Sequence, residues 1–122
     1  MGIKVLEKQG GYGLVGVLRG AYPGRCIAIR ADMDALPIKE TVKEDYKSAN
    51  PGVMHACGHD GHMAILLGAA AVLSKWRQRL RGTLKFVFQP AEEGYGGAKL
   101  MIDAGVLDAA PRVDEIYGLH LW

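Results

Sequence analysis

The chain has 122 residues, 17 of them glycine, and a formal net charge of +2 at pH 7. This length predicts one domain with one buried core, and the scattered basic residues exclude nucleic acid and the membrane surface as main partners. Because two cysteines cannot form a disulfide framework and the longest apolar run is too short to span a bilayer, we expect a soluble, cytoplasmic protein without a membrane partner.

Runs of β-branched and apolar residues predict strands in the first third of the chain. Residues 3–7 and 12–18 flank a pair of glycines and are predicted to form a hairpin. Residues 25–31 alternate apolar side chains on one face and predict a strand that ends at Asp32. The next stretch, residues 36–51, is rich in Pro, Lys, Glu and Asp and predicts a long surface loop, of the kind that is usually functional.

The second half of the chain alternates helices and strands. Apolar residues at three- and four-residue spacing predict a helix over residues 62–80, which Gly82 ends. We also predict a strand over residues 83–89, a short helix over 98–103 and a final strand over 115–122.

This alternation predicts an α/β fold, with a mixed, largely parallel sheet flanked by helices, in a single domain over residues 1–122. Ligands of such sheets bind beyond the carboxyl ends of the strands. Since the chain starts on one predicted strand and stops inside another, which few natural domains do, we expect it to be a fragment of a larger domain.

Residues 55–62, His-Ala-Cys-Gly-His-Asp-Gly-His, gather three of the four histidines, a cysteine and a carboxylate before the long predicted helix. Thiolate, imidazole and carboxylate are ligands for zinc and other divalent transition metals. Cys57 and His59 are two residues apart, so in an extended backbone they would leave the same face and could share one ion. The alternative is a turn that caps the helix through Asp60. The density of ligand-type residues favours the metal site.

A second pattern, Gln-Pro-Ala-Glu-Glu-Gly over residues 89–94, follows the strand predicted over 83–89. Neighbouring side chains of an extended segment point to opposite sides, so one of Glu92 and Glu93 could bind a cation while the other faces a substrate. The alternative is a solvated turn, which is less favoured once the Cys/His cluster is considered.

Two weaker signals lie at other predicted strand ends. Asp32 and Asp34 could orient a ligating histidine or accept a proton, although an Asp-rich turn before Pro37 explains them at least as well. His120 lies in an apolar segment, where a lone histidine is more often a hydrogen-bonded core residue. We retain His120 as a ligand because the metal site needs a further imidazole.

Other chemistries fit the sequence less well. Residues 11–16 match G-x-G-x-x-G, but a strand-like run follows them instead of the helix that would hold a pyrophosphate. No Gly-x-Ser-x-Gly motif is present in the sequence. Cys57 could act as a thiol nucleophile beside His55 or His59, but so many metal-type neighbours favour a thiolate ligand.

Four segments together resemble a known family, the two-metal amidohydrolases and carboxypeptidases of metallopeptidase family 20. The resemblance is to the branch with hippurate hydrolase, N-acyl-amino-acid amidohydrolases and auxin-conjugate hydrolases. The segments are residues 30–37, 51–62, 88–94 and 118–120, and their order and spacing agree with those of the family.

The resemblance implies a metal-activated water that hydrolyses the amide bond of a small N-acyl amino acid or peptide. It implies two divalent ions, of zinc, manganese or cobalt, with Glu92 as the general base and Asp34 as a support of the metal ligands. The residues that match the family's ligands are Cys57, His59, Glu93 and His120.

The resemblance also implies what this chain would lack. Full-length relatives carry a lid and dimerisation domain and a further metal-binding histidine, so we expect the N-terminal part of a truncated zinc-peptidase-like catalytic domain, with a homodimer as one assembly. Alone, it would bind metal weakly and turn over substrate poorly or not at all. The alternatives are a non-catalytic fragment that binds metal or self-associates through exposed strand edges, and a redox or structural zinc protein that uses Cys57.

Overall fold

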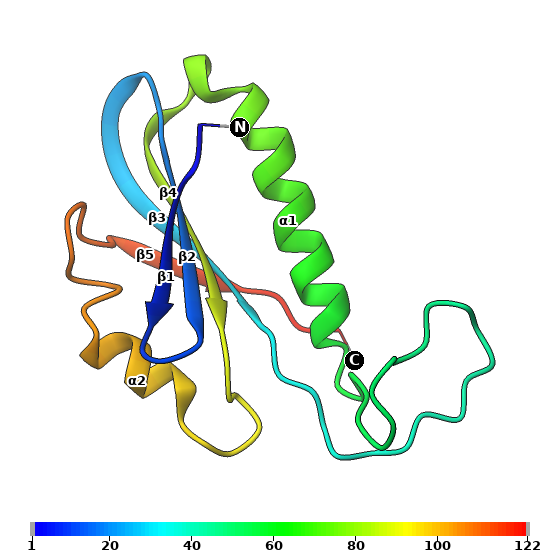
Figure 1. Cartoon of the computed structure of the whole chain (residues 1–122). Coiled ribbons are helices and arrows are strands. Elements are labelled where there is room, and N and C mark those ends of the chain that lie inside the picture. The colour runs from blue at the N-terminus through cyan, green and yellow to red at the C-terminus, as the bar shows by residue number, and fades with distance from the viewer. Residues whose placement is uncertain (1, 122) are drawn as a thin grey trace.

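A computed structural model describes residues 2–121, which are built around a five-stranded sheet with the order β1-β2-β4-β3-β5 (Figure 1). In this sheet β2 pairs antiparallel with β1 and β4, and β3 pairs parallel with β4 and β5. This confirms the predicted α/β fold with a mixed sheet, whose parallel half is β4-β3-β5. The strands are β1 (Lys4–Gln9), β2 (Gly13–Arg19), β3 (Tyr22–Asp32), β4 (Arg81–Gln89) and β5 (Glu115–Gly118).

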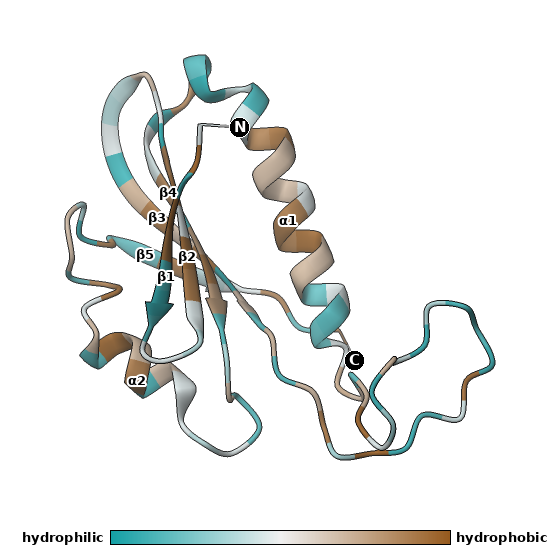
Figure 2. Ribbon diagram, viewed as in Figure 1, coloured by the Kyte–Doolittle hydropathy of each residue, from teal (hydrophilic) through white to brown (hydrophobic). Residues whose placement is uncertain are grey.

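The two helices cover opposite faces of the sheet. On β4, Phe86 and Phe88 are buried against α1 (His59–Lys75), whereas Val87 between them is buried on the side of α2 (Gly97–Asp103). Successive side chains of a strand point to opposite faces, so the alternation in sequence produces two apolar layers. Figure 2 shows apolar residues concentrated on the strands and along α1, with hydrophilic residues dominating the long loop before it. Within the described residues, neither helix is long and apolar enough to cross a membrane.

The long helix begins and ends earlier than predicted. Gly58 has a φ of 77°, a left-handed conformation that glycine adopts without strain, and the helix begins directly after it at His59. Asp60, the N-cap in the alternative interpretation of this segment, lies exposed inside the first turn, where its charge suits the helix dipole. At the other end α1 stops at Lys75, and a 3-10 turn over Arg77–Arg79 leads into β4.

The start of β3 and the end of β5 differ most from the predicted strand boundaries. β3 starts at Tyr22 rather than residue 25, because its first residues pair with Arg81 across an irregular register. β5 ends at Gly118, so residues 119–121 of the predicted final strand are irregular, and Trp122 lies outside the described residues. The predicted loop is irregular, and a bridge between Leu36 and Met54 closes its base.

A glycine at the start of α2 fixes the turn that carries the two glutamates. A Cβ on Gly97 would lie 1.7 Å from the carbonyl oxygen of Pro90, whereas a Cβ on Gly68, in α1, would meet nothing within 4 Å. We therefore expect Gly97→Ala to lower the free energy of unfolding by about 1–3 kcal/mol. Gly68→Ala, the matched control, should raise it by about 0.5–1 kcal/mol because alanine favours a helix interior. Urea denaturation measures both, and a Gly97→Ala variant as stable as the parent would contradict the close approach.

Candidate metal centre

The carboxyl ends of β3, β4 and β5 lie at one edge of the sheet, and the segment after β5 runs from this edge to the first turn of α1 (Figure 1). In the parallel half of the sheet Asp32 pairs with Gln89 and Arg30 pairs with Gly118, so β3, β4 and β5 end at the same edge. The segments that follow these ends carry the acidic pairs and the last histidine. The prediction that the polar clusters gather at strand ends is therefore confirmed by the topology.

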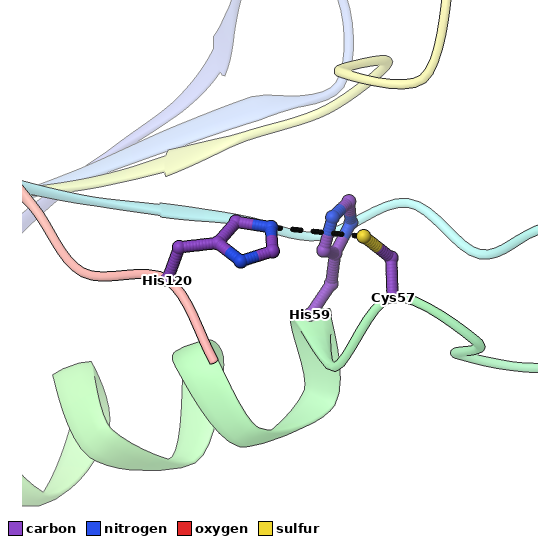
Figure 3. Close-up of side chains that lie close together, drawn as sticks. All are labelled: Cys57, His59 and His120. Carbon is purple, nitrogen blue, oxygen red and sulfur yellow. Dashed lines mark hydrogen bonds between the residues drawn. The ribbon is translucent and has the colours of Figure 1, made fainter. Parts of the chain in front are cut away.

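Three predicted ligands face one another at this edge. Figure 3 shows Cys57, from the turn before α1, and His59, from the first residue of the helix, next to His120 of the segment after β5. The Cys57 Sγ lies 3.6 Å from His120 Nε2, and one donor atom of each residue lies within 4.8 Å of the others. The expected extended backbone between Cys57 and His59 is wrong, because Cys57 lies in a turn and His59 begins α1; this turn and helix start bring the two side chains together.

The ring of His59 has a defined orientation and an open nitrogen. Its Nδ1 lies 2.9 Å from the main-chain oxygen of Asp34, which can only accept, so Nδ1 carries a proton, and in the neutral ring the lone pair is on Nε2. His59 is 1% exposed, and Nε2 has no hydrogen-bond partner among residues 2–121. The oxygens nearest to it, from Asp32 and Glu93, are acceptors as well, each 3.7 Å away. A buried nitrogen that faces two carboxylates without a hydrogen bond suits a cation at this position, either a proton on Nε2 or a metal ion.

The distances between donor atoms fit a transition-metal ion. Two ligands at ordinary zinc–sulfur and zinc–nitrogen bond lengths on a tetrahedral ion are about 3.5 Å apart. The Cys57–His120 separation of 3.6 Å and the His59–Glu93 separation of 3.7 Å are close to this value. The residues present therefore fit a divalent ion held by sulfur, nitrogen and oxygen.

The two glutamates form a second group with His59. The donor atoms of His59, Glu92 and Glu93 lie within 4.8 Å of one another, so His59 belongs to both groups. Both glutamates are exposed and lie on the turn between β4 and α2, in which Ala91 has a positive φ of 54°. Because the Nδ1 of His59 is engaged by Asp34, this ring could bind one ion through Nε2, and the glutamates add carboxylate ligands beside it.

Asp34 contacts both His59 and the turn that carries the two glutamates. Its Oδ2 accepts the main-chain N–H of Glu93 at 2.9 Å, and its Oδ1 lies 3.3 Å from His59 Nδ1. Desolvation alone would raise the pKa of Asp34, but main-chain N–H groups of Glu93 and Glu92 and the nearby His59 lower it below its usual range. Asp34 is thus a carboxylate at neutral pH that connects the glutamate turn to the ring of His59.

Two residues outside the predicted ligand set are also buried at the site. Asp32 and His62 form a group with His59 by distance alone. However, His62 Nδ1 contacts Asp32 Oδ1 at 2.6 Å, and its Nε2 accepts the main-chain N–H of Leu121 at 2.8 Å. Because both ring nitrogens are occupied, His62 does not offer a lone pair to a metal in this conformation.

The Cys57 thiol gives the site a pH dependence. Partial desolvation and the carboxylates of Glu93, Glu92 and Asp32 raise the pKa of the Cys57 thiol in the metal-free chain. A proton must leave this thiol when a metal binds, so protons compete with the metal. We expect the affinity for cobalt to rise about tenfold per pH unit between about pH 6 and about pH 8.

Cobalt titrations at several pH values, followed by absorbance, test this dependence. Cys26→Ala is the matched control, because Cys26 is buried in β3 and belongs to none of the three ligand groups. The control should show the same rise as the parent. An affinity for cobalt that does not change with pH would contradict a thiol ligand.

Comparisons with known proteins are consistent with this geometry. Residues 28–122 match the family described as Peptidase family M20/M25/M40. The chain is 57% identical over 106 residues to an N-acyl-L-amino acid amidohydrolase of Geobacillus stearothermophilus, covering 86% of this chain and 28% of that protein. It is 50% identical over 122 residues to Thermostable carboxypeptidase 2 of Saccharolobus solfataricus, covering 95% of this chain and 30% of that protein.

A solved structure has the same arrangement of elements. The crystal structure of the Bacillus subtilis YXEP protein, described as a dinuclear metal binding peptidase from the M20 family, superposes with a TM-score of 0.90 at 43% sequence identity. The match covers 98% of this chain and 33% of that one. The chain therefore spans about 30% of the length of the curated relatives it matches.

Proposed function

We propose that this chain, which belongs to peptidase family M20/M25/M40, supplies part of the active site of a hydrolase. The proposed hydrolase cleaves the amide bond of N-acyl amino acids with a metal-activated water. The observation that carries the proposal is the buried Nε2 of His59, which faces the carboxylates of Asp32 and Glu93. Without a cation this arrangement of a buried nitrogen and two carboxylates is unfavourable, whereas a bound cation would stabilise it.

In this proposal Cys57, His59, Glu93 and His120 hold the metal. Two divalent ions, of zinc, manganese or cobalt, would polarise the amide carbonyl and lower the pKa of a water when bound. Thiolate and imidazole favour zinc or cobalt, whereas the carboxylate also suits manganese. The Bacillus subtilis neighbour, described as a dinuclear metal binding peptidase, supports the proposed pair of ions.

Glu92 is the proposed general base. Its carboxylate lies within 4.8 Å of the donor atoms of His59 and Glu93. The turn that carries it is exposed, so the carboxylate is open to solvent. From this position it would take a proton from the water and deliver it to the leaving amine, a transfer that contributes about 10² to 10⁴ in rate. Asp34 would position the metal ligands through His59 and the main chain of Glu93 rather than react itself.

A substrate can approach beside the proposed ligands. An open hollow of about 470 Å³ lies over the turn at Cys57 and is bounded by His120 and Leu121 on its other side. The relative named as an N-acyl-L-amino acid amidohydrolase supports a small N-acyl amino acid or peptide as the substrate class.

The proposed location is the cytoplasm, because a free thiol as ligand suits a reducing compartment. The proposed assembly is a homodimer.

A second candidate function is a non-catalytic fragment that binds metal or self-associates. The observation that favours it is the apolar surface of α1, where Ile65, Leu67 and Val72 are each about half exposed. The two candidates differ in one experiment, hydrolysis of N-acyl amino acids by the parent chain and by Glu92→Gln, with the bound metal measured in both. Activity that is lost in the variant while metal is retained supports the hydrolase, and an inactive parent supports the fragment.

A further inference from the structure

A largely buried chain of polar side chains runs beneath the proposed metal ligands. Gln89 at the end of β4 accepts a hydrogen bond from Arg30 Nε at 2.9 Å, and Arg30 Nη1 donates to Asp32 Oδ2 at 2.7 Å. Asp32, which is 1% exposed, then accepts from His62 through its other oxygen. Buried polar groups in a satisfied network hold one another in a single geometry.

His62 is the member of this chain that reaches the segment after β5. The Leu121 main-chain N–H must donate, so His62 Nε2 is the acceptor and Nδ1–H donates to the Asp32 carboxylate. The ring of His62 is 3% exposed and has one fixed tautomer in this network. It therefore connects the carboxyl end of β3 to the main chain next to His120.

Leu121 also packs directly on the first turn of α1. Its Cβ lies 3.6 Å from the place of a Cβ on Gly58, and its Cδ1 lies 2.7 Å from the place of a Cβ on Gly61. A side chain at Gly61 would therefore displace Leu121, and glycine leaves the space that it occupies. The helix start provides both a hydrogen-bond acceptor and a packing surface for this one residue.

This attachment matters because the segment has little regular structure of its own. β5 ends at Gly118, and residues 119–121 belong to no helix or strand. The His120 ring lies against His62 itself, with 4.8 Å between ring centroids. Figure 3 shows the segment that carries His120 passing close to the first turns of α1.

From these contacts we infer that His62 is a positioning residue, which holds His120 opposite Cys57 by binding the main chain of Leu121. His62 acts through its two neighbours and does not bind the metal. The inference rests on the proposed function, since it assigns a role toward the proposed metal ligands.

Cobalt is the probe for this inference, because its spectrum reports the thiolate and the remaining ligands separately. His62→Leu removes both hydrogen bonds at similar size, and we expect its affinity for cobalt to fall about 10- to 100-fold, as for other residues that orient a ligand. The visible bands should change because His120 no longer binds, whereas the thiolate-to-cobalt band should remain. His62→Gln, whose amide offers a donor and an acceptor, should restore most of the affinity.

Two further variants separate positioning from general loosening and from misfolding. Leu66→Ala is the matched control, because Leu66 is a buried residue of α1 at 3% exposure that contacts the apolar core instead of the network. It should lose stability and keep the parent cobalt spectrum. Leu121→Pro removes the N–H at a half-exposed position outside the core, so it should fold and lose cobalt affinity even if His62→Leu does not fold.

The outcomes distinguish this inference from the proposed function. If the parent binds cobalt through its thiolate and both His62→Leu and Leu121→Pro keep its affinity and spectrum, the inference is overturned and the metal site stands. An equal loss in Leu66→Ala also overturns it. If the parent binds no cobalt, the proposed function fails and the inference fails with it.

Discussion

Glu92→Gln is expected to lower the rate of N-acyl amino acid hydrolysis by about 10² to 10⁴ while the bound metal is unchanged. The substitution keeps the size of the side chain and removes the group that would take a proton from the water. The Glu92 side chain is exposed on its turn, and the substitution leaves its main-chain hydrogen bonds in place, so the loss should not reflect unfolding. The measurement is release of the amino acid from a panel of N-acyl amino acids by the cobalt-loaded chain.

The neighbouring residue provides the control for this result. Glu93→Gln changes the carboxylate 3.7 Å from His59 Nε2, so it should lower metal affinity as well as rate. A Glu92→Gln variant with the parent rate would contradict its role as the base. A parent chain that binds metal and hydrolyses none of the panel would support the non-catalytic fragment instead.

Cys57→Ser is expected to lower the affinity for cobalt by about 100-fold or more, since removal of a residue that only orients a ligand already costs about 10- to 100-fold. The serine hydroxyl keeps the shape of the side chain but does not ionise near neutral pH, so the thiolate ligand is lost. The thiolate-to-cobalt band should disappear, and the rise of affinity with pH should become shallower. Absorbance titration measures all three effects.

The fold of the metal-free chain should tolerate this change. Cys57 lies in a turn and is not part of either buried apolar cluster, so the free energy of unfolding without metal should change by less than about 0.5 kcal/mol. Unfolding of the metal-free parent would favour a structural zinc protein, in which metal binding supplies the folding energy. A Cys57→Ser variant with the parent cobalt affinity would contradict a cysteine ligand.

The sequence was most informative where residue patterns repeat. Alternation around Phe86, Val87 and Phe88 specified a strand between two apolar layers. The spacing of apolar residues located the middle of α1 but not its ends. Helix ends depend on single residues, and here the left-handed Gly58 starts the helix three residues before the apolar pattern begins. The pattern also could not indicate that residues 119–121 leave the sheet.

The site was predictable as a set of residues but not as a network. Cys57, His59 and the two glutamates were conspicuous because ligand-type residues cluster in two short segments, one before α1 and one after β4. His62 belonged to the same motif, yet its role depends on contacts with Asp32 and Leu121, which are distant in sequence. The spacing of Asp32 suggested a residue that orients a histidine, although that signal was no stronger than an ordinary turn.

Anomalous diffraction from crystals grown with zinc or manganese tests whether Cys57, His59, Glu93 and His120 converge on one metal centre. We expect anomalous peaks bonded to Cys57 Sγ and His59 Nε2, with the Glu93 carboxylate and the His120 ring completing the ligands. Peaks elsewhere on the chain, or Cys57, His59 and Glu93 pointing to different sides of the molecule in a metal-soaked crystal, would contradict this expectation.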